Sequence, residues 1–333
     1  MIPEAFHATF QRLIDGARQF VLVTHINPDG DALGSQFGLG AFLLERGARV
    51  RIVDQDPVPA ALRFIAQPAL EVEVYDAARH DAALAATELV VLVDNSAPDR
   101  LGRMEPVMRR LAGRTLCIDH HPARDVPWAH ALIDAGSCAT TAMIYELTRR
   151  CGWRPSAAAA EALYVGLATD TGFFRFNSTS ADAHEIAAAL LRLGVEPARS
   201  FREIYERNSA AFTRLLGLGL ARLRMDAGGA VASVQLDRAL IEAAQAQDVD
   251  PSEITTPLLA IDGVLVAALF RELPDGRIKV SLRSKGELDV HGLAAEFGGG
   301  GHRNASGIVV EGRLEAVAAQ VTARATALLA ARR

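Results

Sequence analysis

The chain has 333 residues, half of them hydrophobic, and a formal net charge of −5. This length fits two domains of roughly 100–200 residues each. The acidic balance excludes a basic surface that tracks the backbone of a long nucleic acid duplex. The N-terminus shows no basic segment followed by an apolar one, and no apolar run reaches the roughly 18–20 residues of a membrane span. We therefore expect a cytoplasmic protein without a membrane partner.

Short apolar runs predict the framework of the first domain. Residues 20–23 predict a buried strand, and an amphipathic helix after it ends at Gly47. Residues 48–53 predict a second strand that completes a right-handed βαβ unit. Two further strands are predicted at 89–93 and 114–118. Runs of this kind are typical of parallel sheets buried on both faces, so we expect a doubly wound α/β domain.

Histidines and aspartates follow three of these four strands. Because open parallel sheets gather ligands at the carboxyl edge, where the strand order reverses, we expect these side chains to lie close together. Carboxylates with one or two imidazoles suit Mn²⁺ or Mg²⁺. A plainer interpretation of the first group is a polar turn in which Asp31 caps the following helix. The residues are His25, Asp29 and Asp31 after the first strand, Asp94 after the third, and Asp119, His120 and His121 after the fourth.

Helical patterns dominate the middle of the chain. Helices are predicted at 139–150, 157–169 and 182–193, and the second runs into Asp170. Residues 197–216 show a long amphipathic pattern with little turn chemistry, which we interpret as a helical connector.

The last third of the chain predicts a smaller mixed α/β domain. Its expected strands are 231–236, 264–270 and 278–282, and its expected helices are about 237–246, 291–297 and 313–331. The expected division is a catalytic domain at 1–194, a connector at 195–224 and a second domain at 225–333, with the active site in a cleft between the domains.

Four segments resemble, in order, the motifs of the DHH phosphoesterase superfamily, and two later segments are similar to the DHH-associated C-terminal domain. The resemblance spans nearly the whole chain and is strongest to the two-domain bacterial nanoRNases and 3′-phosphoadenosine-5′-phosphate (pAp) phosphatases. The segments are HINPDGDALGS (25–35), VD (93–94), DHHP (119–122) and ATDTG (168–172), then SLRS (281–284) and GGGGHRNASG (298–307).

The resemblance implies two divalent metal ions, with Mn²⁺ favoured over Mg²⁺. It implies that Asp94 bridges the two ions, that Asp119 orients a histidine, and that His121 contacts the phosphate and assists the leaving oxygen. The implied ligands are His25, Asp29 and Asp94 for one ion, and Asp31, Asp94, His120 and Asp170 for the other.

The C-terminal motifs imply a substrate-binding surface. Glycines let backbone N–H groups approach an anion, although four glycines in a row also fit a flexible linker. An arginine at 283 can pair with two phosphate oxygens. The expected substrate contacts are Arg283, Ser284, Gly299, Gly300, Gly301, His302 and Arg303.

We therefore expect a metal-dependent hydrolase of pAp and of very short RNA, including the linear dinucleotides pGpG and pApA. The alternatives are a cyclic-dinucleotide phosphodiesterase and a manganese-dependent inorganic pyrophosphatase. A non-enzymatic nucleotide sensor would be expected to have lost ligands, and none is lost here. One departure from the family is Ser137-Cys138, where two serines are common, so a hydroxyl contact from position 138 is missing. Whether the protein forms a homodimer is left open.

Overall fold

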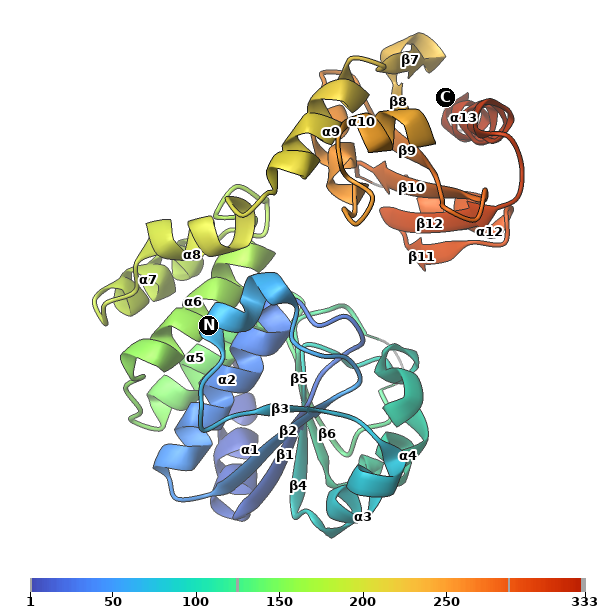
Figure 1. Ribbon diagram of the computed structural model, residues 1–333. Coiled ribbons are helices and arrows are strands. Elements are labelled where there is room, and N and C mark those ends of the chain that lie inside the picture. Colours follow the sequence, from blue (N-terminus) through green and yellow to red (C-terminus); the bar gives the residue numbers. More distant parts are fainter. Residues whose placement is uncertain (1, 124–125, 287, 331–333) are drawn as a thin grey trace. The chain divides into compact units, whose positions relative to one another are not determined.

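A computed structural model describes residues 2–123, 126–286 and 288–330 (Figure 1). The chain forms two compact units, one ending at Arg207 and the other beginning at Asn208. Within the described residues, no helix is both long enough and apolar enough to cross a lipid bilayer. The cleft expected between the domains stays a prediction.

The first unit is built on a six-stranded sheet in which every neighbouring pair is parallel. Its order is β3-β2-β1-β4-β5-β6, so the order reverses between β1 and β4 at the centre. This reversal is the switch point at which doubly wound sheets bind ligands. The strands are β1 (Gln19–Val23), β2 (Arg49–Asp54), β3 (Val72–Val74), β4 (Leu89–Val93), β5 (Thr115–Asp119) and β6 (His130–Ile133).

Both faces of this sheet are buried, which explains the unbroken apolar runs of its strands. In β1, Phe20 and Leu22 join one apolar cluster, whereas Val21 and Val23 join another on the opposite face. Helices on both sides of the sheet contribute to these clusters (Figure 1). The first cluster includes residues of α1 (Glu4–Asp15), α2 (Gly30–Glu45), α5 (Thr140–Arg150) and α6 (Ala157–Asp170); the second includes residues of α3 (Ala77–Ala86) and α4 (Glu105–Arg110).

The doubly wound α/β domain is thus confirmed, and the four predicted strands are present. The sequence analysis did not predict β3 and β6, the two edge strands. Both are short, and their side chains are mostly only partly buried. Edge strands of this kind lack the long apolar run that marks a central strand.

Helices α2 and α6 lie unusually close together, because glycines face the contact. A side chain at Gly34 would come within 2.5 Å of the Ala162 carbonyl oxygen, and one at Gly38 would collide with Leu163. Since α6 ends at Asp170, this contact brings that carboxylate toward the first turn of α2.

The sequence predicts a helical connector over residues 197–216 with few turn-forming residues. The structure corrects this expectation, because the helical segment is interrupted. Helix α8 (Pro197–Tyr205) and helix α9 (Ala210–Leu220) are separated by a short break that contains the boundary between the units. The side chain of Ser209 accepts a hydrogen bond from the Phe212 backbone N–H and so starts α9 afresh.

The second unit contains a mixed six-stranded sheet of order β11-β12-β10-β9-β8-β7, in which only β8 and β9 pair in parallel. The expected mixed α/β domain is confirmed. Its strands are β7 (Arg224–Asp226), β8 (Val231–Leu236), β9 (Val266–Glu272), β10 (Ile278–Ser284), β11 (Gly300–His302) and β12 (Ala305–Val310). Its further helices are α10 (Arg238–Ala243), α11 (Thr255–Leu259), α12 (Val290–Ala295) and α13 (Leu314–Ala330); α7 (Ala181–Leu191) belongs to the first unit.

The glycine run is part of this sheet and not a flexible linker. Gly300 pairs with Gly307 across β11 and β12. A side chain at Gly299 would collide with the Gly307 carbonyl oxygen, and Gly301 has a φ of 141° that favours glycine. Backbone geometry and close packing therefore account for these two glycines. Their expected contact with a phosphate stays a prediction.

Candidate metal centre

The loop after β1 is held from both neighbouring strands. The Thr24 backbone N–H donates to Asp54 on β2 at 3.1 Å, and its hydroxyl donates to the Val93 carbonyl on β4 at 2.9 Å. Further along, Asp29 Oδ1 accepts from two N–H groups in the first turn of α2. The residue that caps the helix is therefore Asp29, not Asp31. Its other oxygen, Oδ2, lies 3.9 Å from His25 Nε2.

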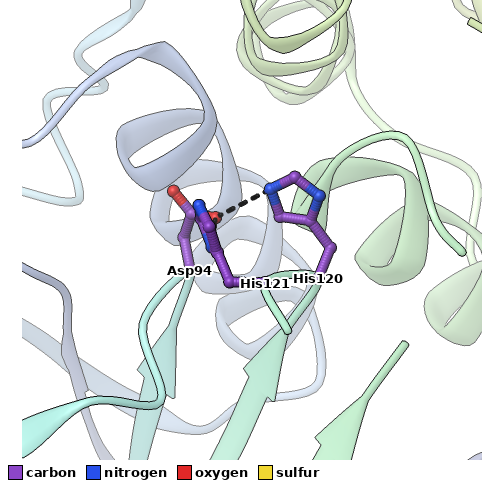
Figure 2. Close-up of side chains that lie close together, drawn as sticks. All are labelled: Asp94, His120 and His121. Atoms are coloured by element: carbon purple, nitrogen blue, oxygen red, sulfur yellow. Dashed lines mark ion pairs between the residues drawn. The ribbon is translucent and has the colours of Figure 1, made fainter. Parts of the chain in front are cut away.

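Asp94 lies between two histidines at the end of β4. Its Oδ2 is 3.5 Å from His25 Nε2, and its Oδ1 is 3.7 Å from His120 Nε2 (Figure 2). The backbone of Asp94 has a φ of 57°, a left-handed conformation that is strained for a residue other than glycine. This turn of the chain directs the carboxylate across the end of the sheet.

Among the described residues, two groups of three side chains could each hold a metal ion, and a third group overlaps them. Within each group the ligand atoms lie within 4.8 Å of one another. Asp94 occurs in the first group and contacts His120 of the second, so the two groups adjoin at this carboxylate. The groups are His25, Asp29 and Asp94; Asp31, His120 and Asp170; and Asp94, His120 and His121.

The Nε2 atoms of His25 and His120 are suited to bind a metal ion. His25 Nδ1 lies 2.7 Å from the Ile26 carbonyl oxygen, and His120 Nδ1 lies 3.3 Å from that of Ser137. A carbonyl can only accept, so in the neutral form of each ring Nδ1 carries the proton and Nε2 keeps its lone pair. Both Nε2 atoms are buried and make no hydrogen bond with the protein. A cation beside them would supply the missing partner.

The carboxylates are also placed as a cation would require. Burial raises the pKa of Asp94 well above its usual range, and the charges of Asp31 and Asp29 raise it further. Burial and the same two charges raise the pKa of Asp170 to about 8. Crowded carboxylates of this kind favour protonation unless positive charge is added. A divalent cation would reverse the effect, so the donor set fits the predicted metal site.

Two threonines that the sequence analysis missed hold the carboxylates in place. Asp31 accepts hydrogen bonds from the backbone N–H groups of Thr140 and Thr141, at 2.6 and 2.9 Å, and from the Thr141 hydroxyl at 2.6 Å. The Thr140 hydroxyl donates to Asp94 Oδ1 at 2.9 Å. The available signal was their position at the start of a predicted helix, where free N–H groups favour an anion. Cys138 lies just before them, and burial raises the pKa of its thiol to about 11.

Asp119 and His121 form a hydrogen-bonded pair beside the metal ligands. Asp119 Oδ1 accepts from the backbone N–H and from Nδ1 of His121, at 3.1 and 2.8 Å. Burial would raise the pKa of Asp119, but the hydrogen bonds from His121 hold it below its usual value. The hydrogen bond to Asp119 in turn raises the pKa of His121. The pair therefore keeps a proton on Nδ1 and leaves Nε2 for another partner.

The expected substrate contacts of the second unit gather around the ends of β10 and β11. Arg283 is half-buried, and its Nη1 donates to the carbonyl of Leu282. The Ser284 hydroxyl donates to the Leu288 carbonyl at 2.7 Å and accepts from Asn304, so it is used within the fold.

Arg303 is exposed at this end of β11, and its carbonyl accepts from the Val290 N–H at 2.7 Å. The side chain of His302 lies outside the described part of the structure.

Two protein-family models match the chain in the same order as the motifs found in its sequence. Residues 19–167 match the DHH family, N-terminal domain, and residues 236–329 match the DHHA1 domain. The bifunctional oligoribonuclease and PAP phosphatase NrnA of Thermus thermophilus is 31% identical over 87% of this chain and 84% of its own length. The chain belongs to the DHH family. The resemblance found in the sequence is thereby confirmed.

Two other proteins match over similar lengths. The NrnA of Bacillus subtilis, with the same bifunctional description, is 30% identical over 86% of this chain and 88% of its own. A crystal structure of an exopolyphosphatase-related protein from Bacteroides fragilis superposes with a TM-score of 0.88 at 28% identity. It covers 98% of this chain and 96% of the other. The matches to these relatives thus cover residues of both units.

Proposed function

We propose that this DHH-family protein is a metal-dependent hydrolase of very short RNA, of roughly two to five nucleotides, and of pAp. The linear dinucleotides pGpG and pApA belong to the first substrate class. The observation that carries the proposal is the pair of ligand groups joined at Asp94. The names of the relatives support the choice of substrate, because they describe oligoribonuclease and PAP phosphatase activity in one protein.

We assign one divalent ion to His25, Asp29 and Asp94, and a second to Asp31, Asp94, His120 and Asp170. Ions held there would polarise a phosphate oxygen and lower the pKa of a water molecule. Mn²⁺ is the proposed ion, with Mg²⁺ as the alternative, because imidazole ligands suit manganese better than magnesium. Thr140 and Thr141 keep two of the carboxylates oriented while the substrate binds.

His121 is the proposed general acid. Its Nδ1 proton is held by Asp119, so Nε2 faces the substrate and can donate a proton to the leaving oxygen. Asp119 remains charged beside it because its pKa is lowered, and this charge stabilises the imidazolium form. Asp119 is thus a positioning residue for His121.

The second unit is the proposed substrate-binding part, with residues 1–194 for hydrolysis and 225–333 for binding. Arg283 would pair with a phosphate, and the backbone of Gly299, Gly300 and Gly301 would approach it closely. His302 and Arg303 complete the proposed set, together with Ser284.

We also propose a cytoplasmic location. All three cysteines are free thiols, which is typical of a reducing compartment.

A substrate panel tests the proposal. The panel contains pAp, RNA from a dinucleotide to about 24 nucleotides, cyclic dinucleotides and pyrophosphate, each with Mn²⁺ and with Mg²⁺. We expect the highest kcat/KM on di- to pentanucleotides and on pAp, and almost no turnover of the longest RNA. A preference for pyrophosphate or for cyclic dinucleotides would replace the proposal with the corresponding alternative.

A further inference from the structure

Arg100 lies next to the candidate metal centre but belongs to none of its ligand groups. It belongs to the 3₁₀ helix η2 (Pro98–Met104), which follows Asp94 at the end of β4. The Arg100 carbonyl accepts a hydrogen bond of 2.8 Å from the N–H of Ile26, the residue after His25. The backbone of Arg100 is therefore fixed against the loop that carries the first metal ligands.

The charge of Arg100 acts on two imidazoles of the site. Burial lowers the pKa of His25, and the positive charge of Arg100 lowers it further. The same charge opposes the rise in the pKa of His121. Both imidazoles lie beside Asp94, at 3.5 and 3.7 Å from its two oxygens. The backbone hydrogen bond to Ile26 places Arg100 beside His25, which shares the Asp94 carboxylate with His121.

Arg100 has no anionic partner among the residues that the structure describes, although the site is rich in carboxylates. Its Nε is buried and makes no hydrogen bond. An enclosed guanidinium N–H without an acceptor is unfavourable, and the repulsion would grow once metal ions occupied the same centre. An anion bound between the ions and Arg100 would accept a hydrogen bond from the guanidinium. Its charge would also offset the repulsion between Arg100 and the ions.

We propose that Arg100 binds a non-bridging oxygen of the substrate phosphate on the side of His25 and His121. A guanidinium can donate two parallel N–H groups to phosphate, which suits this position better than an ammonium group. This inference rests on the proposed function for the identity of the substrate, but an anion site at Arg100 can be measured without turnover.

The test compares Arg100→Ala and Arg100→Lys with Arg103→Ala in the manganese-loaded protein. Arg103 is a matched control, because it lies on the same segment, beyond the kink at Gly102, but is exposed and bonds to Gln55. We expect Arg100→Ala to lose about 100-fold in kcat/KM on a linear diribonucleotide, with the manganese content unchanged by elemental analysis. Arg100→Lys should show an intermediate loss, and Arg103→Ala should stay near the wild-type value.

Two further readouts separate contact with the phosphate from a structural role. Added guanidinium ion should restore part of the activity of Arg100→Ala and should not raise that of Arg103→Ala. Inorganic phosphate should bind the manganese-loaded wild type more tightly than either Arg100 variant, as measured by calorimetric titration. Unchanged kinetics and phosphate affinity in both Arg100 variants, or a loss of manganese that accounts for the lost rate, would overturn the inference.

The same experiment distinguishes this inference from the proposed function. A wild-type protein that does not cleave the diribonucleotide contradicts the proposed function, while phosphate binding still decides the role of Arg100. A wild type that cleaves it, with Arg100 variants that match it in rate and phosphate affinity, contradicts only the inference.

Discussion

Replacement of Asp54 by asparagine should remove a pH-dependent loss of stability from the first unit. Asp54 is fully buried at the end of β2. Burial raises the pKa of its carboxyl to about 7, even though hydrogen bonds from Gln36 and Thr24 act in the opposite direction. Both bonds reach Oδ1, an acceptor that asparagine retains. The variant therefore removes the titrating proton and keeps these two contacts.

The size of the effect follows from the difference between the folded and unfolded pKa values. The ordinary value is 3.8, so the carboxyl gains about three pKa units on folding, and each unit corresponds to about 1.36 kcal/mol. Because the folded pKa is raised, the folded chain holds the proton more tightly. The resulting stability is present below about pH 4 and is lost as the pH rises through about 7. As the pH rises between these limits, the free energy of unfolding of Asp54→Asn should increase by up to about 4 kcal/mol relative to that of the wild type.

Urea unfolding followed by tryptophan fluorescence measures this difference. The chain has two tryptophans, Trp128 and Trp153, and both lie in the first unit, so the signal reports that unit. A chelator removes the contribution of bound metal, and Asp99→Asn serves as the control at an exposed position. If the stability difference between Asp54→Asn and the wild type stays constant within about 1 kcal/mol from pH 4.5 to 8, the argument from burial is refuted.

Three further predictions concern the metal centre. Asp94→Ala should abolish hydrolysis more completely than the loss of any single terminal ligand, since it serves both ions; near-normal turnover of the folded variant would disprove the bridge. His120→Ala should lower the metal content, whereas His121→Ala should keep the metal and lose about 10²–10⁴-fold in kcat. Elemental analysis beside steady-state kinetics tests this difference, and equal metal loss would contradict it. Asp119→Asn should move the alkaline limb of the kcat–pH profile to lower pH, because Asp119 raises the pKa of the acid His121; an unmoved limb would exclude that role.

Local sequence patterns were sufficient to predict the central strands of the parallel sheet. The apolar run of β4 has both faces buried, and a run of this kind predicts a central parallel strand without knowledge of its neighbours. The break before α9 was missed, because an amphipathic pattern on both sides outweighed the single capping residue Ser209. No strand was predicted over the glycine run, because glycine weakens the strand pattern even where strand packing requires it.

The sequence by itself identified the candidate metal ligands and the strand and helix ends at which they lie. Only the tertiary structure decided how they meet: Asp94 between two histidines, and Asp31 held by Thr140 and Thr141 from a distant helix. It also placed Arg100 beside this centre. The physical reason is that strand and helix patterns report short-range periodicity, whereas the centre depends on the parallel order of β1, β4 and β5 and on the close packing of α2 against α6.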